Sequence, residues 1–545
     1  MIIADQVAQG LYELGIRRVY GLPGEDHMAL LDSFAKAGLD YRAAFNESAA
    51  VIMAATEAQV SGLPGVAVLS LAPGVSNGVN GLLNTYLDEV PLILVSGQHP
   101  ADSLPFVVRQ GFDIAQMVAP MTKWRAKVTS GMNVPAVLGR AVDEAMSGRP
   151  GPVYLELPDG VAVAEPRSAA EPRSAADAGP RLRARWTGEP EQAPASPAAV
   201  AGLADRLARA EHPVLVVGGR RRRLSPETLA AFAEAYRVPV LTSSRQKGLL
   251  DGGCAYFAGT FLNGTLEKDL VGQADLILMV DPESFDFYNK GWNFSAPAVA
   301  LIDDKFTEWM NPFEQTFVGD PEAVLAALTA SKDRAASTWT DAAVAEYRAG
   351  LRAKLLPETD VFSVAHAVEA ALSAWPTDGY LVADAGFGKP LVAMLSEPSE
   401  PDAYFASNAL STMGYTIPTT VALRRAVDRP ILGFLGDGSL LMRAPEIAVS
   451  AEAGPGAVYL AIMDRSLTQI SVKQERRDLA TVGVTLPPVS CAKLGDALGV
   501  EGVDAQSADE VAAAVAKGLS GDRPVLVGAY VDPEPSRVLF ELLRG

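Results

Sequence analysis

One stretch, Ile431 to Ser466, constrains the fold of this chain more than any other. An apolar run from Ile431 to Leu435 ends in Gly436-Asp437-Gly438-Ser439, a helical segment follows, and a second apolar run from Ala457 to Met463 ends at Asp464. Glycines beside an aspartate permit a sharp turn and a close approach of the backbone to a ligand. The order of elements predicts a parallel β-α-β unit whose two turns lie at the carboxyl ends of adjacent strands, where such sheets bind ligands.

Two carboxylates that face one crevice repel each other unless a cation lies between them. Asp437 and Asp464 therefore form a candidate site for Mg²⁺, a cation that takes oxygen ligands and shares its shell with water and phosphates. The alternative is a plain glycine turn with a solvated aspartate, because short glycine motifs recur by chance. The residues of this stretch alone leave both interpretations open.

Apolar runs of strand length alternate with helical segments along the chain. The predicted strands are 18–21, 65–71, 90–96 and 153–157 in a first unit, 212–219, 238–242, 275–280 and 298–302 in a second, and 380–383, 431–435, 457–463 and 524–531 in a third. Helical periodicity covers 4–14, and 341–354 is a charged helical connection. Alternation of this kind predicts parallel sheets covered on both faces. The fold class is therefore α/β, with three doubly wound parallel-sheet domains.

Shifts in composition predict where these domains begin and end. Two copies of Glu-Pro-Arg-Ser-Ala-Ala open an Ala/Pro-rich stretch, which is typical of a surface linker. We expect a first domain at 1–164, this linker at 165–197, a central α/β domain at 198–335, a linker helix at 336–356 and a third domain at 357–545.

The central domain has two features that bear on ligand binding. It carries no Gly-x-Gly-x-x-Gly fingerprint, so we assign it no dinucleotide, and FAD is not expected although a flavin or nucleotide stays an open alternative. Four consecutive arginines, Arg220 to Arg223, are interpreted as a solvated loop, with a phosphate site as the alternative.

The overall charge and the cysteines limit the classes of partner. A formal net charge of −19 argues against a nucleic-acid partner, because binding to phosphates requires a basic face. Cys254 and Cys491 lie far apart and outside metal-type spacings, so we expect no disulfide framework and a reducing compartment. We identify no signal peptide and no apolar run long enough to span a bilayer. These features predict a cytoplasmic protein without a membrane partner.

The acidic turns resemble the diphosphate-binding motif of thiamine-diphosphate enzymes. Gly436-Asp437-Gly438-Ser439 matches the start of that motif, which in the family usually closes with Asn-Asn. Without gaps, Met463 takes the first Asn position and Asp464 the second, which binds the metal in the family. Aspartate retains an oxygen ligand but adds a charge, so the closing half of the motif departs from the family.

The first unit extends the resemblance. Residues 45–57, 65–77, 95–99 and 122–124 resemble the pyrimidine-binding domain of this family, in its acetolactate synthase-like and simple 2-oxo acid decarboxylase branch. The resemblance runs over nearly the whole chain and implies pyrimidine-binding, central and diphosphate-binding domains in that order. It implies that Glu47 is the catalytic glutamate that contacts N1′ of the cofactor's aminopyrimidine, and a helix-start residue near the helix dipole is the alternative.

The third unit resembles the other half of the cofactor site. Residues 384–388 resemble a turn that contacts the diphosphate, with a helix cap as the alternative, and residues 407–414 resemble the segment that supports the bent cofactor. In that segment Met413 would lie beneath the cofactor, or be an ordinary core methionine, and the Ser411 carbonyl, where the family commonly has glycine, would accept the 4′-amino group. The cofactor-binding residues implied are Asp384, Gly386, Phe387, Gly388, Ser411, Met413, Gly436, Gly438, Ser439, Leu467 and Thr468, and the metal ligands implied are Asp437, Asp464 and Ser466.

The substrate side departs further from the family. Glu25 occupies a position near the reacting carbon where pyruvate-type decarboxylases carry an acid, and it is the candidate for proton delivery, with a helix-start carboxylate as the alternative. Asn46 replaces the histidine that commonly precedes the catalytic glutamate, and Phe112-Asp113 replaces a common Phe-Gln pair. The candidate substrate-pocket residues are Asp26, His27, Leu71, Phe112 and Asp113.

The resemblance implies an enzyme that uses thiamine diphosphate and Mg²⁺ to decarboxylate a 2-oxo acid, with release of an aldehyde or carboligation to a second carbonyl compound. It also implies a homodimer or homotetramer with active sites between subunits. The departures at Asn46, Ser411 and Asp464 motivate a second hypothesis, a cofactor-binding protein that has lost catalysis and acts by assembly or regulation. The sequence does not distinguish decarboxylase from carboligase, nor one 2-oxo acid from another.

Overall fold

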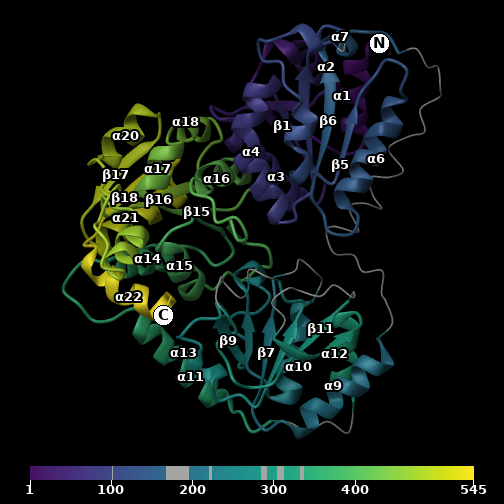
Figure 1. The fold of residues 1–545 in the computed structure, drawn as a ribbon. Coiled ribbons are helices and arrows are strands. Elements are labelled where there is room, and N and C mark those ends of the chain that lie inside the picture. The colour runs from purple at the N-terminus through teal and green to yellow at the C-terminus, as the bar shows by residue number, and fades with distance from the viewer. Residues whose placement is uncertain are drawn as a thin grey trace.

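The computed structural model describes residues 1–100, 102–166, 195–219, 224–283, 286, 291–303, 312–331 and 337–544. Most of the linker predicted at 165–197, and the whole of Arg220 to Arg223, lie outside the described residues. Within them the chain forms three six-stranded sheets, in which every strand pair is parallel. Each sheet forms a separate lobe with helices on its faces (Figure 1). The predicted α/β class with three doubly wound parallel sheets is confirmed.

The first sheet has the strand order β2-β1-β3-β4-β6-β5. Its alternating residues face two sides: Val66 and Val68 pack under α1, α2 and α6, while Ala67 and Leu69 pack under α3 and α4. The strands are β1 Arg18–Gly21, β2 Asp40–Ala43, β3 Gly65–Leu69, β4 Leu92–Gln98, β5 Trp124–Lys127 and β6 Pro152–Pro158, and the helices are α1 Ile3–Glu13, α2 Met28–Ala37, α3 Glu47–Ser61, α4 Leu71–Leu87, α5 Ile114–Met117, α6 Val134–Met146 and α7 Asp159–Ala162, with 3₁₀ turns η1 Glu25–His27, η2 Leu104–Phe106 and η3 Ala119–Met121.

The third sheet repeats the topology of the first, in the order β14-β13-β15-β16-β18-β17. Its strands are β13 Tyr380–Ala383, β14 Tyr404–Ala406, β15 Ile431–Gly436, β16 Ala457–Met463, β17 Glu501–Ala505 and β18 Val525–Tyr530, and its helices are α14 Val364–Ser373, α15 Gly388–Leu395, α16 Thr416–Ala426, α17 Asp437–Arg443, α18 Pro445–Ala451, α19 Thr468–Glu475, α20 Cys491–Ala497, α21 Ala508–Ser520 and α22 Glu534–Arg544. The predicted unit around Ile431 is confirmed, since β15 and β16 pair in parallel with Gly436 opposite Ile462.

The central sheet has a different order, β12-β11-β10-β7-β8-β9. This is the order of the dinucleotide-binding doubly wound fold, although the glycine fingerprint is missing from the sequence. Its elements are β7 Pro213–Val217, β8 Val240–Thr242, β9 Phe257–Thr260, β10 Leu276–Val280, β11 Ala298–Ile302, β12 Phe313–Val318, α9 Pro197–Arg209, α10 Pro226–Tyr236, α11 Lys268–Val271, α12 Pro321–Ala330 and the 3₁₀ turn η5 Ser244–Gln246; the connecting helix α13 is Asp341–Leu355.

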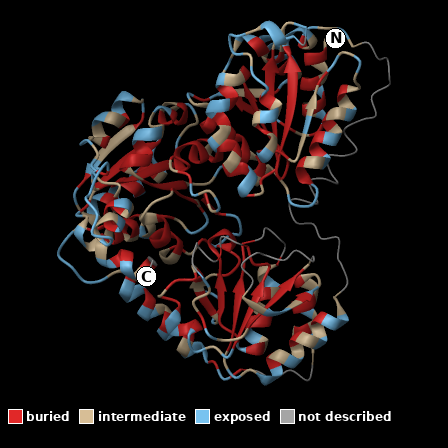
Figure 2. Cartoon of the chain, in the orientation of Figure 1, coloured by how far each residue is buried: buried red, intermediate tan, exposed pale blue. Residues whose placement is uncertain are grey.

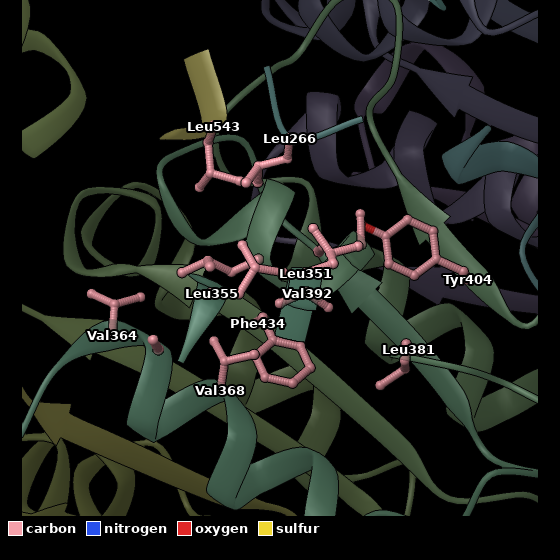
Figure 3. Packing of buried hydrophobic residues seen from close by; sticks show 14 of the residues in the cluster. Leu266, Leu351, Leu355, Val364, Val368, Leu381, Val392, Tyr404, Phe434 and Leu543 are labelled. Carbon is pink, nitrogen blue, oxygen red and sulfur yellow. The ribbon is translucent and has the colours of Figure 1, made fainter. Parts of the chain in front are cut away.

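The central and third lobes share one apolar core. Leu351 and Leu355 of α13 pack with Leu266 of the central lobe and with Val392 and Phe434 of the third (Figure 3). The inner strands are largely buried in all three lobes (Figure 2). Because helix α13 fills the space between two sheets, it fixes the third lobe against the central one rather than serving as a loose connection.

Four predicted strands have boundaries that are wrong by two residues. In the central lobe, the strand predicted at 212–219 ends at Val217 and the strand predicted at 238–242 begins at Val240. The strand predicted at 65–71 ends at Leu69, because helix α4 begins at Leu71, and the strand predicted at 90–96 runs from Leu92 to Gln98. The shift in β4 brings Gln98 to the carboxyl edge of the first sheet, where the candidate substrate residues lie.

Candidate cofactor-binding and active site

Several candidate residues lie at the switch points of the first and third sheets. In each sheet the strand order reverses between the first and third strands of the lobe, and ligands bind outside the carboxyl ends of strands at such points. In the third lobe this point lies between β13, followed by Asp384, and β15, followed by Asp437. In the first lobe it lies between β1, followed by Glu25, and β3, followed by Leu71.

The two acidic turns of the third lobe are joined by hydrogen bonds. The carboxylate of Asp437 accepts the backbone N–H of Gly438 at 2.8 Å and that of Arg465, on the second turn, at 2.7 Å. Asp464 accepts the N–H of Ser466 at 3.1 Å and the hydroxyl of Thr468. The prediction that both turns share one edge is therefore confirmed by their contact.

The electrostatics of this pair fit a cation. Burial, and next the charge of Asp464, raise the pKa of Asp437 to about 6. Burial also raises the pKa of Asp464. No cluster of three or more His, Cys, Asp or Glu suited to a metal occurs in the described part of the chain. A divalent ion here would take two carboxylates from the protein and complete its shell with carbonyls, water or phosphate oxygens, which is the mixed set that Mg²⁺ accepts.

Asp384 contacts the protein rather than solvent. Its buried carboxylate accepts the N–H of Gly414 at 3.0 Å, that of Thr416 at 2.9 Å and the hydroxyl of Ser439 at 2.8 Å. Burial raises the pKa of this carboxyl group. Asp384 thus ties together the turn after β13, the segment at 407–414 and the turn after β15. It does not cap helix α15, whose N-cap is Phe387.

Two predicted cofactor residues, Met413 and Leu467, converge on Gly438. A Cβ atom at Gly438 would lie 2.9 Å from Leu467 and 3.0 Å from Met413, so a larger residue would require these side chains to shift. At Gly386, Gly388 and Gly436, by contrast, a Cβ atom would point into open space. The glycines therefore do two things: Gly438 permits close packing, and the other three leave exposed backbone that a diphosphate group can approach.

Ser411 occupies a backbone conformation that glycine adopts more easily. The backbone φ of Ser411 is 53°, in the left-handed region, and Ser411 is exposed. A serine held there costs on the order of 1 kcal/mol relative to glycine. The departure from the family at this position therefore leaves the backbone geometry of a glycine intact.

In the first lobe, Glu47 begins helix α3. Asn46 is the N-cap, and its side chain accepts the N–H groups of Ser48 and Ala49 at 2.9 and 3.4 Å. The Glu47 carboxylate is half-buried and accepts a hydrogen bond from the Asn77 side chain. Asn46 therefore replaces the histidine of the family with a residue that caps the helix, and the carboxylate is held from a second helix.

A buried glutamate of the third lobe reaches the same turn. Glu446, on α18, accepts the N–H of Phe45 at 3.2 Å, and its own burial raises its pKa to about 7. Sequence reasoning did not identify Glu446 or Asn77 as functional. Asn77 lies inside the segment at 65–77 that resembles the family. Phe45 and Glu446 are 401 positions apart, and nothing in the local sequence predicts their contact.

Asp26 and His27 are buried and bonded within the first lobe. The Asp26 carboxylate accepts the Ser70 hydroxyl and the N–H of Leu71, the latter at 3.3 Å, and lies 3.4 Å from Nδ1 of His27. Burial opposes ionisation, but the hydrogen bonds from His27 and Ser70 hold the pKa of Asp26 below its usual range. Of the two neighbouring carboxylates, Glu25 is exposed to solvent and Asp26 is not.

Phe112 and Asp113 line a pocket of about 530 Å³ at the β5–β6 edge of the first sheet. Phe112 is 55% exposed, and the Asp113 carboxylate caps α5 by accepting the N–H of Gln116 at 2.9 Å. Lys127 and Glu156 line the same pocket and form an ion pair at 3.1 Å. The pocket therefore offers both an apolar ring and fixed charges to a ligand.

Comparisons with known proteins agree with this arrangement. Three domain models of the thiamine pyrophosphate enzyme family match in order: the N-terminal TPP binding domain at residues 1–117, the central domain at 200–328 and the C-terminal TPP binding domain at 384–529. A solved structure named for a thiamin diphosphate-dependent enzyme isolated from Mycobacterium smegmatis has a TM-score of 0.77 at 22% identity, and the match covers 98% of this chain and 100% of that one. This likeness shows the fold.

Curated relatives match along nearly their whole length. A probable 2-ketoarginine decarboxylase of Pseudomonas aeruginosa is 28% identical over 521 residues, which cover 92% of this chain and 89% of the relative. The large subunit of acetolactate synthase isozyme 2 of Escherichia coli is 26% identical, with 97% and 95% covered. The chain belongs to the thiamine pyrophosphate enzyme family, in its acetolactate synthase-like and 2-oxo acid decarboxylase branch.

Proposed function

We propose that this chain is a thiamine-diphosphate- and Mg²⁺-dependent enzyme that decarboxylates a 2-oxo acid, and that it then releases an aldehyde or joins the remaining fragment to a second carbonyl compound. The observation that carries the proposal is the pair of acidic turns that meet at the carboxyl ends of β15 and β16, within a chain of this family. The bound cofactor supplies a nucleophilic carbon and an electron sink for the departing CO₂.

The residues of the third lobe would hold the cofactor and metal. Asp437, Asp464 and Ser466 are the proposed metal ligands. The open backbone at Gly386, Gly388 and Gly436 would face the diphosphate, with Phe387, Ser439 and Thr468 beside it, and Met413 and Leu467 would support the cofactor from beneath, next to Gly438. Asp384 would act by fixing the turn after β15 and the segment at 407–414, because its carboxylate accepts hydrogen bonds from Ser439 and Gly414.

Two carboxylates of the first lobe would move protons. Glu47, oriented by Asn77, would exchange a proton with a ring nitrogen of the cofactor. Glu25 would deliver a proton to the reacting carbon, since it is exposed beside the buried pair Asp26 and His27. Leu71, Phe112 and Asp113 would shape the substrate site.

We also propose a homodimer or homotetramer with active sites between subunits. Phe45, Leu441 and Met442 support this, because these large apolar side chains are 62%, 39% and 56% exposed next to proposed site residues. Mixing Glu47→Gln with Asp464→Ala protein tests it: mixed dimers contain one site with both halves intact and should regain activity. Sites contained within one chain would give no recovery on mixing.

The cytoplasm is the proposed compartment. Both cysteines are free and buried, and among the helices of the described part of the chain none has the length and apolar character needed to cross a membrane.

The test of the activity is a substrate panel. Purified protein with Mg²⁺ and thiamine diphosphate is incubated with pyruvate, branched-chain 2-oxo acids and 2-ketoarginine, the last because one relative is named for it. Release of CO₂ with an aldehyde product would identify a decarboxylase, and a 2-hydroxy ketone or acid would identify a carboligase. Bound cofactor without turnover of any substrate would favour the second hypothesis, a catalytically impaired protein. The hydrogen bond from Asn77 that orients Glu47 argues against that hypothesis.

A further inference from the structure

Helix α4 carries a row of polar residues along one face. Asn77, Asn80, Asn84 and Asp88, the C-cap of the helix, are spaced by three or four residues, and this spacing brings side chains together on an α-helix. Asn77 and Asn80 are exposed, whereas Asn84 and Asp88 are 3% and 6% exposed. Polar side chains buried in this way require partners.

Their partners lie in the third lobe, in the segment that precedes Met413. Asn80 accepts the hydroxyl of Thr412 at 2.9 Å, and Asn84 accepts the hydroxyl of Ser407 at 2.5 Å. The Ser407 hydroxyl in turn accepts the N–H of Thr412 at 2.9 Å, which closes the segment into a loop. One face of α4 therefore fixes both ends of the segment from Ser407 to Thr412.

Asp88 binds the middle of this segment and adds a third lobe to the contact. Its carboxylate accepts the N–H of Ala409 at 3.0 Å and that of Asn408 at 3.4 Å. It also pairs with Arg245 of the central lobe at 2.9 Å, and both side chains are at most 8% exposed. A buried carboxylate shared among three lobes couples the position of the segment to the packing of the whole chain.

The other end of the same face holds the candidate catalytic carboxylate. Asn77 donates to Glu47, and four residues further along the N–H of Gly81 donates to the Ser48 hydroxyl at 2.9 Å. Helix α4 thus contacts the start of α3 at one end and the segment at 407–412 along the rest of its length.

We infer that α4 is a positioning helix for the active site, a role that rests on the proposed function. Through Asn77 it orients Glu47, and through Asn80, Asn84 and Asp88 it sets the segment that carries Ser411 and leads into Met413. In an assembly with sites between subunits, one α4 helix would orient Glu47 in one active site and position the segment at 407–412 in another.

Exposed Asn80 permits a test that does not disturb the core. Asn80→Ala, Thr412→Val and the double variant are titrated with thiamine diphosphate and Mg²⁺ by calorimetry. Each single variant should bind the cofactor about three- to ten-fold more weakly, the effect of one lost hydrogen bond, and the double variant should be no weaker than either. Ser76→Ala is the matched control, because this exposed α4 hydroxyl donates only to Pro73 of its own helix, at 3.0 Å, among the contacts described.

Asn77→Ala tests the other end of the helix. It should lower kcat at saturating cofactor while the dissociation constant of the cofactor stays within about twofold of wild type. Cofactor binding by Asn80→Ala as tight as that of wild type, or additive losses in the double variant, would overturn the inference. If wild-type protein itself binds no thiamine diphosphate with Mg²⁺, the proposed function fails instead.

Discussion

Glu446→Gln is a sharp test of the electrostatics at the junction of the first and third lobes. Glu446 is 1% exposed, and one of its carboxylate oxygens accepts the N–H of Phe45 at 3.2 Å, while the other has no hydrogen-bond partner in the described structure. Burial raises its pKa from 4.5 to about 7; the charge of Glu47 adds to this, and Arg443 and the Phe45 and Asn46 amides oppose it.

The sign and size of the pH effect follow from this shift. A carboxyl group with a raised pKa in the folded state contributes stability that is fully present below pH 4.5 and is lost as the pH rises through about 7. The loss amounts to at most about 3 kcal/mol, an upper bound because the surroundings relax around the charge. Glutamine keeps the acceptor for Phe45 and cannot ionise. The variant should therefore match wild type near pH 4.5 and be more stable by up to about 3 kcal/mol at pH 8.

The measurement is urea unfolding of both proteins from pH 4.5 to 8, followed by tryptophan fluorescence. The quantity compared at each pH is the difference in free energy of unfolding between the variant and wild type, because all other titrating groups occur in both proteins. Glu452→Gln is the control: its side chain is 75% exposed at the end of the same helix, 4.0 Å from Arg425, so removing its charge relieves no burial penalty and should not stabilise the protein at pH 8. A pH-independent difference for Glu446→Gln, or a less stable variant at pH 8, would refute the reasoning.

Three further substitutions test separate parts of the account. Glu47→Gln should leave cofactor affinity within a few fold and lower turnover about 10²- to 10⁴-fold, and unchanged exchange of the cofactor's C2 proton for deuterium would sink the assignment. Asp464→Ala should weaken Mg²⁺-dependent binding of thiamine diphosphate at least about tenfold by calorimetry, because it removes one of the two carboxylates proposed to bind the metal; unaffected affinity would show that the second turn is misaligned. Asp88→Asn should lower the free energy of unfolding by up to about 3–5 kcal/mol, because it breaks a buried ion pair with Arg245, and an unchanged unfolding midpoint would contradict this.

The inner strands of each sheet were predictable, and the edge strands were not. All twelve strands predicted from the sequence are inner strands, and each appears within a few residues of its predicted place. The six that were missed, β2, β5, β9, β12, β14 and β17, are the two edges of each sheet. Inner strands of a parallel sheet are buried on both faces and so read as continuous apolar runs. Edge strands such as Asp40–Ala43 are short and partly exposed, and carry no such signal.

The site divides in the same way. Motifs that form a turn after an inner strand, such as Gly436 to Ser439, are local in sequence, and their geometry could be anticipated. The contacts that hold the site together join residues more than three hundred positions apart, as between Asn84 and Ser407 or Phe45 and Glu446. Such pairs depend on how the lobes pack, which periodicity and spacing within one lobe do not encode.

Decarboxylation by this protein is measured by the release of labelled CO₂ from 2-oxo acids labelled at C1. Wild-type protein should release labelled CO₂ with thiamine diphosphate and Mg²⁺, should release none after both are removed by chelation and dialysis, and should release it again when both are restored. Release that continues without the cofactor, or that proceeds equally well in Glu47→Gln, would contradict the proposed function.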